Sequence, residues 1–396
     1  MIIYILFLAI FSLDYLGGTL GLLPRIFTWL PEILSGLVAI QVVFMIIRRR
    51  AIDLSVKYIL LFSVLLVLIM SSVIANGVQP GAVFASIRGY LKYLPFFFLP
   101  LVISISDEKL RKQINFLFIL ILMQVPISIL QRFFIHSGLK TGDIVMGTVG
   151  NSSVLTIVCL SSIAILIAFY FNRLISLKKL ILLVVLCLIP PSINETTVTI
   201  FMLPIAFLIP FFLYMRHAEN KAGLVLMLSV GMFAMVGFGV VYDQLYGHRW
   251  GGSILNIVTD PDQLSGFLSK DDLSEKSDGR IEGDVGRFDS ILLAWNYIYK
   301  YPTKLLMGVG MGNALESFSD KLIGEYNLIY RIKGGQNTSL SHLLWEFGVL
   351  GTLLIFMLFF YILRDTYVLI NSNNRLYSAL SLGWAAVVVL VAGGIG

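Results

Sequence analysis

The residues of this chain best able to do chemistry are arginines, a histidine and glutamates that lie near the ends of apolar segments. Arg287 opens a segment with helical periodicity, and Arg88 follows a polar turn at Asn76–Pro80. A guanidinium presents a planar fork of donors that matches the oxygens of a phosphate. Arg88 can bind a phosphate in this way, or it can extend to lipid headgroups, and the sequence leaves both interpretations open.

His342 and Glu346 form the second candidate constellation. They are four residues apart, so they share one face of a helix. Such a pair can be a general base held in place by a carboxylate. It can equally be a structural hydrogen bond, and the spacing does not separate the two interpretations.

Glu195 and Asn194 form the third candidate, in a predicted turn that runs from Pro190–Pro191 to Thr197. The favoured interpretation is a helix cap, with Glu195 in the first turn of the next helix. The alternative is a carboxylate and an amide that line a substrate cavity. The polar stretch late in the chain adds further binding candidates, namely Arg249, Arg280, Gln336 and Asn337.

Several kinds of site are not predicted. There is no phosphate-binding P-loop sequence, no HExxH, and no Cys/His ligand spacing, so neither an ATPase nor a zinc enzyme is expected. The glycine run Gly308–Gly312 follows no strand pattern, which argues against a dinucleotide site. Cys159 and Cys187 both lie in apolar runs and form no disulfide framework. We therefore expect no metal and no cofactor.

The composition indicates which kind of structure positions these residues. Apolar residues make up 58% of the 396 and charged residues only 13%, against about 25% charged in soluble domains. Since each bilayer crossing needs about 20 apolar residues, the sequence predicts an all-α bundle of about eleven spans. Their ranges are 2–22, 28–47, 57–75, 90–105, 114–135, 152–171, 178–193, 196–215, 222–242, 338–363 and 376–395.

The basic residues orient this bundle. If the spans alternate, five basic loops fall on the same side, among them Arg48–Arg50 and Lys109–Lys112. By the positive-inside rule this side is cytoplasmic, and so is the N-terminus. The net charge of +6 is then a topology signal and does not indicate a nucleic-acid partner.

The chain is predicted to have three parts. Residues 1–242 form nine spans, 243–337 form one large loop on the outer side, and 338–396 form the last spans, the final one short or truncated. Within the loop, Gly286–Tyr301 is predicted to be an amphipathic helix that ends before Pro302. Its apolar positions at helical spacing are Phe288, Ile291, Leu292, Trp295, Ile298 and Tyr299.

The stretch from Gly286 to Gly351 resembles the O-antigen polymerase and O-antigen ligase superfamily. The matching pieces are an arginine, an aliphatic-Trp helix, a proline, a Gly-x-Gly turn and a Glu-x-Gly-x-x-Gly sequence. In this chain they are Arg287, Trp295, Pro302, Gly308–Gly310 and Glu346–Gly351. The predicted topology, with many spans and one dominant outer loop late in the chain, also resembles that of this superfamily.

The resemblance implies a membrane glycosyltransferase at the outer face of the bacterial inner membrane. It would join undecaprenyl-pyrophosphate-linked oligosaccharide units into an O-antigen, capsule or exopolysaccharide, without metal or nucleotide. By position, Arg287 is the first pyrophosphate contact and Arg88 the second, and a histidine such as His342 would activate the acceptor hydroxyl. Membrane lipid and a polysaccharide chain-length regulator are the further partners that the resemblance implies.

Two alternatives stay open. An O-antigen-type ligase would transfer the glycan to lipid A core or protein, but ligase-like members show a His-Asn pair where this chain has Gln336–Asn337, with His342 later. This departure favours a polymerase. A transporter of lipid-linked saccharides would be expected to show repeat symmetry and broken helices at mid-membrane. No repeat is evident, and the polar residues concentrate at the outer rim instead of the midplane, which favours an enzyme. The absence of paired carboxylates favours direct, inverting transfer.

Overall fold

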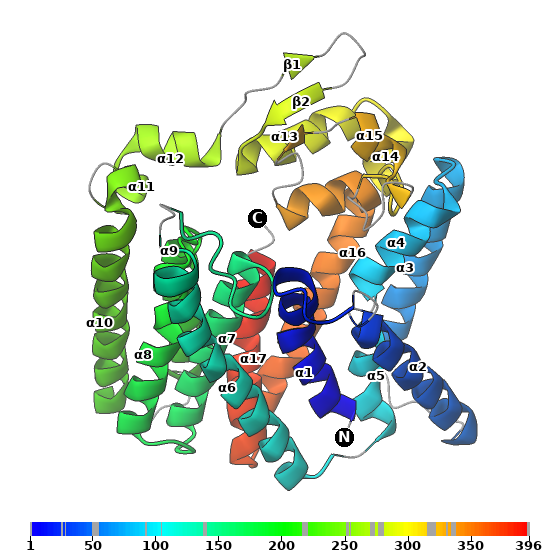
Figure 1. Ribbon diagram of the computed structural model, residues 1–396. Helices are drawn as coiled ribbons and strands as arrows, with labels where there is room; N and C mark the ends of the chain where they lie inside the picture. Colours follow the sequence, from blue (N-terminus) through cyan, green and yellow to red (C-terminus); the bar gives the residue numbers. More distant parts are fainter. Residues whose placement is uncertain are drawn as a thin grey trace. The chain divides into compact units, whose positions relative to one another are not determined.

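The computed structural model places the chain in a mainly helical fold with three short strands (Figure 1). It describes residues 2–393 except 25–26, 28, 50–54, 92, 104, 138–140, 216–220, 251–252, 254, 270–273, 276–280, 315–321, 330–331 and 334–337.

Seven helices among the described residues are long and apolar enough to cross a membrane. They are Leu30–Arg48, Val56–Ala75, Asp107–Ile135, Ser152–Phe171, Leu228–Tyr246, Ser339–Ile370 and Arg375–Ala392. Two shorter apolar helices, Ile2–Gly17 and Thr199–Met215, accompany them. The prediction of a helical membrane protein is therefore confirmed in its class. The count of eleven spans stays a prediction.

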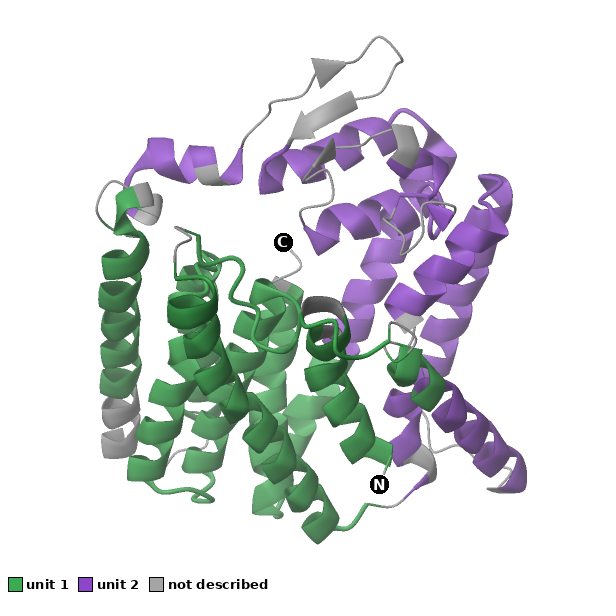
Figure 2. Ribbon diagram, in the orientation of Figure 1, with its two compact units in different colours: residues 1–34, 105–256, 362–394 green, residues 35–104, 257–361, 395–396 purple. Residues whose placement is uncertain are grey.

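The chain divides into two compact units, each made of segments far apart in the sequence (Figure 2). Unit 1 comprises Met1–Leu34, Ile105–Asn256 and Ile362–Gly394. Its helices are α1 Ile2–Leu13 with the turn η1 Asp14–Thr19, α6 Asp107–Leu130 with η3 Gln131–Ile135, α7 Ser152–Phe171, α8 Leu177–Ile193, α9 Thr199–Met215, α10 Lys221–Tyr246 with η4 Gly247–Trp250, and α17 Arg375–Gly393.

Helix α7 is the centre of unit 1, and α8, α9 and α17 pack around it. Small residues make this close packing possible, since Ala164, Ala168 and Ala379 are fully buried. A Cβ on Gly383 of α17 would lie 2.8 Å from the Cα of Ile165. Small residues at such contacts let helix backbones approach closely, as is usual between membrane helices.

Unit 2 comprises Ser35–Ser104 and Ile257–Tyr361, together with the last two residues. Its elements are most of α2 Leu30–Arg49, then α3 Val56–Ala75, α4 Pro80–Leu91, α5 Leu94–Val102, α12 Pro261–Leu268, β1 Ser274–Glu275, β2 Ile281–Asp284, α13 Arg287–Ile298, α14 Pro302–Met307, α15 Glu325–Ile329, β3 Ile332–Lys333, and α16 Ser339–Ile370 as far as residue 361. The short helix α11 Asn256–Thr259 begins at the boundary between the units.

The surface of the unit 2 spans is apolar. On α3, for example, Leu60, Val67 and Ile74 are each more than half exposed. In a soluble protein such a run of exposed aliphatic side chains would be an aggregation liability. On a helix long enough to cross a bilayer it is the face that meets lipid tails.

Two predicted elements differ in the structure. The expected span 90–105 is instead the last two residues of α4 followed by a separate nine-residue helix, α5, which starts at Leu94. Pro95 fits this start, because the amide N–H that proline lacks is not needed in a first helical turn. The turn expected at Pro190–Pro191 begins later, because α8 continues through both prolines to Ile193.

Candidate functional site

The structure divides the sequence-predicted site residues between the two units. Unit 2 contains Arg88, Arg287, His342 and Glu346, and unit 1 contains Asn194, Glu195 and Arg249. For Arg249 only the backbone is described, in η4. Arg280, Gln336 and Asn337 lie outside the described residues.

The starts of α13 and α16 are brought together by the small sheet. Strand β2 leads into α13 and pairs in parallel with β3, which precedes α16, so that Asp284 lies opposite Lys333. Two parallel strands run in the same direction, so the ends of the strands that precede α13 and α16 lie side by side. Arg287 opens α13 and His342 lies in the first turn of α16.

The two helices also share one hydrophobic cluster. Ala294 and Ile298 of α13 are fully buried against a set that includes Leu344 and Trp345 of α16. In Figure 1, α13 lies above the first part of α16. The packing therefore fixes the direction of α13, and with it the position of Arg287.

Arg287 is half-buried at the first position of α13, directly after Gly286. Burial lowers the pKa of its guanidinium, because loss of water disfavours the charged form. An arginine nevertheless stays protonated at neutral pH. A partly desolvated cation at a helix N-terminus, where backbone N–H groups are unpaired by the helix itself, suits an anionic ligand.

The glycine run forms a turn with left-handed backbone at alternate positions. The φ angles are +74° at Gly308, +98° at Gly310 and +90° at Gly312. A Cβ at Gly308 would lie 2.5 Å from the carbonyl carbon of Glu346, and one at Gly312 would overlap the carbonyl oxygen of Ala82. Glycine is therefore required both by the backbone conformation and by the close approach of α4 and α16.

Glu346 is the residue that holds this turn. Its side chain is fully buried, and its Oε1 accepts a hydrogen bond of 2.9 Å from the Gly312 amide. The Ser86 hydroxyl donates to Oε2 at 3.3 Å, and the Tyr90 hydroxyl and the Ala314 amide also donate to the carboxylate.

These four donors occupy a carboxylate that offers about four lone-pair sites. Glu346 is thus engaged with α4 and the glycine turn, which differs from the expected role as a partner for His342. The sequence spacing could not show this, because the glycine turn that contacts Glu346 is not part of α16, the helix that carries both His342 and Glu346. The geometry makes Glu346 a positioning residue, and His342 lies one turn nearer the start of α16, half-buried.

Helix α16 changes direction directly after this site. Gly348 has φ +62° and ψ −166°, which is not helical. A Cβ there would lie 2.5 Å from the amide nitrogen of Gly308, and the Val309 amide donates to the Trp345 carbonyl at 2.7 Å. The kink therefore makes room for the glycine turn and separates residues 339–347 from the longer segment 349–370.

The end of span α3 holds the other side of the turn. The Ser72 hydroxyl donates to the Met307 carbonyl at 2.7 Å, and the Asn76 amide donates to the Gly308 carbonyl at 3.2 Å. Ser72 is almost fully buried. The site in unit 2 is therefore anchored at the last turn of a membrane-spanning helix.

Lys304 is a cation that the sequence analysis missed. Its Nζ lies 4.4 Å from the ring centre of Tyr301 and 5.1 Å from that of Tyr326, and it donates to the Tyr297 hydroxyl at 3.2 Å. Cation–π contacts of this kind stabilise a partly buried charge. No motif marks this group, because Tyr297 and Tyr326 come from different helices, α13 and α15.

Arg88 lies on another side of α4. Ser86 and Tyr90, four residues apart, share the face that meets Glu346, and Arg88 lies two residues from each of them. Residues two apart point to nearly opposite sides of a helix. Arg88 is half-buried, and its two sequence-based interpretations both stay open.

In unit 1, Glu195 holds a loop. Its Oε2 accepts hydrogen bonds from the Gly142 amide at 2.6 Å and from the Thr141 hydroxyl at 3.0 Å. Its backbone is left-handed, with φ +59°, which is uncommon for a residue with a side chain. The carboxylate thus joins the α8–α9 connection to the loop that follows η3.

The neighbours of Glu195 also form hydrogen bonds to other helices. Asn194 is fully buried and donates to the Ser152 carbonyl and the Thr156 hydroxyl, both at 2.9 Å. Tyr246 donates to the Ile193 carbonyl at 2.6 Å. These contacts give the α8–α9 connection partners on both α7 and α10.

Arg132 is a second cation that the sequence analysis missed, because it lies inside the predicted span 114–135. Its Nη1 donates to the Thr141 carbonyl at 3.2 Å, and its guanidinium lies 5.3 Å from the centre of the Tyr246 ring. Arg132 therefore belongs to the same buried group as Glu195. The sequence signal that could have identified Arg132 is its polar side chain at the end of an apolar segment.

Replacing Glu195 tests this structural role. Glu195→Ala should destabilise the 141–148 loop by about 1–3 kcal/mol, because the buried Gly142 amide loses its acceptor. Hydrogen exchange of the peptides that cover this loop should rise. Glu108→Ala is the matched control, since Glu108 forms an exposed ion pair with Lys112, and exposed pairs contribute little. Unchanged exchange in Glu195→Ala would contradict the role.

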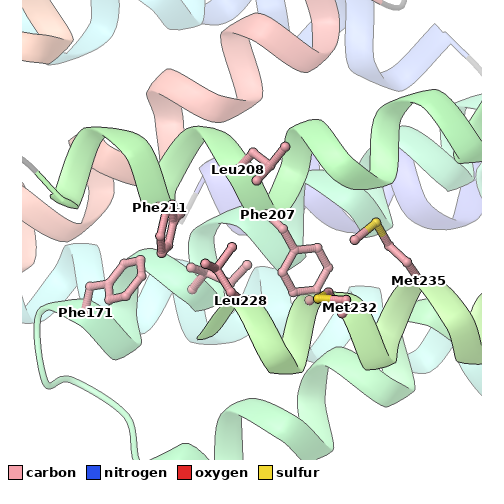
Figure 3. A pocket seen from close by; sticks show the side chains of 9 residues that line it. Phe171, Phe207, Leu208, Phe211, Leu228, Met232 and Met235 are labelled. Atoms are coloured by element: carbon pink, nitrogen blue, oxygen red, sulfur yellow. The ribbon is translucent and has the colours of Figure 1, made fainter. Parts of the chain in front are cut away.

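An apolar pocket in unit 1 is of a different kind. It lies between α7, α9 and α10 and is lined by apolar residues, among them Phe171, Phe207, Leu228 and Met232 (Figure 3). None of the lining residues carries a charge or a polar side chain. The pocket can accept a hydrocarbon but offers nothing to a phosphate or a sugar.

Comparison of the chain with protein-family models, with curated proteins and with solved structures gives no match in any of the three. The family resemblance and the function it implies therefore stand as a proposal, supported by residues and geometry.

Proposed function

We propose that this protein is a membrane glycosyltransferase that polymerises undecaprenyl-pyrophosphate-linked oligosaccharide units into a surface polysaccharide. One observation carries the proposal: Arg287 and His342 lie near the starts of two packed helices, and the strands that precede these helices pair in parallel. A cation for the pyrophosphate and a base for the acceptor hydroxyl are the two groups that this reaction needs.

In the proposed reaction, an acceptor sugar hydroxyl attacks the anomeric carbon of the lipid-linked donor. A new glycosidic C–O bond forms, and the bond between the anomeric carbon and the pyrophosphate oxygen breaks. The electron pair leaves with undecaprenyl pyrophosphate, whose developing charge Arg287 stabilises. His342 takes the proton of the attacking hydroxyl, and direct attack inverts the anomeric centre.

The remaining predicted residues take supporting roles in this proposal. Glu346 positions the glycine turn, and Arg88 is a second pyrophosphate contact. Glu195 and Asn194 shape the α8–α9 connection. The protein would sit in the bacterial inner membrane with about eleven spans, a cytoplasmic N-terminus, and residues 243–337 on the outer side.

The products of a gene deletion test the proposal. Cells that lack the protein should carry single repeat units on their surface acceptor and accumulate the lipid-linked unit. Purified protein in nanodiscs, given the lipid extract of those cells, should then form a ladder of longer glycans. Long glycan retained on the lipid carrier would indicate a ligase instead, and unchanged surface glycan would exclude both.

His342→Ala should reduce the rate of chain extension by at least about 10²-fold, because a general base contributes roughly 10²–10⁴-fold. The measurement is the initial rate of ladder formation in nanodiscs at equal protein content. His248→Ala is the control, because His248 is exposed and lies in unit 1. If His342→Ala and His248→Ala extend the glycan equally fast, His342 is not the base.

A further inference from the structure

Helix α13 has a second apolar face whose side chains stay partly exposed. The buried face contains Ser290, Ala294 and Ile298. The exposed face is a stripe of Phe288, Leu292, Trp295 and Tyr299, here called the aromatic stripe, whose members are between 39% and 65% exposed. At 100° per residue the centres of the two faces are about 130° apart.

The depth of α13 in the membrane follows from its neighbours within unit 2. α14 begins four residues after α13 ends, and its last residue, Met307, accepts the hydrogen bond from Ser72. Ser72 lies in the last turn of α3, a span of 20 residues, which is about 30 Å long and just crosses the hydrocarbon core. The α13–α14 segment is therefore held at the level where the hydrocarbon core ends.

The composition of the aromatic stripe fits this level. Tyrosine and tryptophan concentrate at membrane interfaces, because their rings are apolar and their polar tips reach water or headgroups. The rings of Trp295 and Tyr299 are stacked, with centres 6.1 Å apart, and form one continuous surface. Lys300, which follows directly, is exposed and can meet lipid phosphates.

We infer that α13 is an interfacial helix whose aromatic stripe is embedded among the lipid headgroups. Its other face packs on residues 339–347 of α16, so α13 lies between lipid and the start of α16. This places Arg287, at the first position of α13, at the depth of lipid phosphates. The inference does not rest on the proposed glycosyltransferase activity, because lipid contact is measured without substrate.

Spin labels on α13 test the inference. The native cysteines, Cys159 and Cys187, are buried, so an introduced cysteine is the labelled position. Trp295→Cys places the label on the aromatic stripe, and Asn296→Cys is the matched control, exposed and polar and turned by about 100° around the same helix. The full chain is placed in nanodiscs of phosphatidylethanolamine and phosphatidylglycerol, and collisions with oxygen and with a water-soluble nickel chelate are measured.

The expected result is a several-fold higher oxygen-to-nickel accessibility ratio at position 295 than at position 296, because oxygen partitions into lipid. Equal ratios at both positions, with free access for the nickel chelate, would place the stripe in water and overturn the inference. A label at 295 that is immobilised and shielded from both reagents would show that protein covers the stripe, which would also overturn it.

Discussion

Cells that carry Arg287→Ala should lose long-chain glycan while the protein still inserts into the membrane. The guanidinium would stabilise the pyrophosphate as charge develops on it, and removing one such donor costs about 10²–10³-fold in rate. Because polymer length depends on many successive transfers, a loss of this size in each transfer should leave only the shortest glycans. The measurement is the glycan ladder, compared at equal membrane levels of the protein.

Two companion variants separate the effect of the guanidinium's donor geometry from the effect of its positive charge. Arg287→Lys keeps a positive charge but loses the planar fork of donors, so it should restore only a small part of the activity. Lys300→Ala removes an exposed charge one residue after the aromatic stripe and should leave the ladder intact. A normal ladder from Arg287→Ala would remove Arg287 from the active site.

The elements predicted best from the sequence are those with an uninterrupted apolar pattern. The expected span 152–171 coincides with α7, and the amphipathic segment 286–301 contains α13. In both segments, the helix expected from the local sequence pattern is also the helix that the packed structure contains. The prediction at 90–105 was wrong because it used hydropathy alone, which does not detect that helix α4 ends at Leu91 and that α5 begins at Leu94.

The candidate site was predictable as a set of residues but not as a set of contacts. The spacing of His342 and Glu346 correctly placed both on α16. It could not show that Gly312, which is 34 residues away in the chain, donates to Glu346. Lys304 was missed for the same reason, because its partner Tyr326 comes from another helix, whereas Arg132 was missed because it lies inside the predicted span 114–135.

The same long-range contacts explain why the faces of α13 were not separated by the sequence. Phe288, Trp295 and Ile298 all fit one apolar pattern, but only Ile298 packs against α16. Helical periodicity measures how apolar residues cluster around the axis and does not say which cluster meets protein. In a membrane protein the second cluster can meet lipid.

Gly312→Ala should strongly destabilise unit 2. The new Cβ would overlap the Ala82 carbonyl oxygen, and the backbone at φ +90° is strained for any side chain. Left-handed strain and overpacking each cost about 1–3 kcal/mol, so we expect a loss of about 3 kcal/mol or more. The Gly312 amide would also shift away from Glu346.

Gly89→Ala is the matched control, because a Cβ at Gly89 on α4 meets nothing within 4 Å. In a helix, alanine is favoured over glycine by about 1 kcal/mol, so Gly89→Ala should be neutral or stabilising. Thermal unfolding of both variants in the same detergent gives the comparison. If the two midpoints coincide, the turn at Gly308–Gly312 is not packed against α4, and Glu346 does not hold it there.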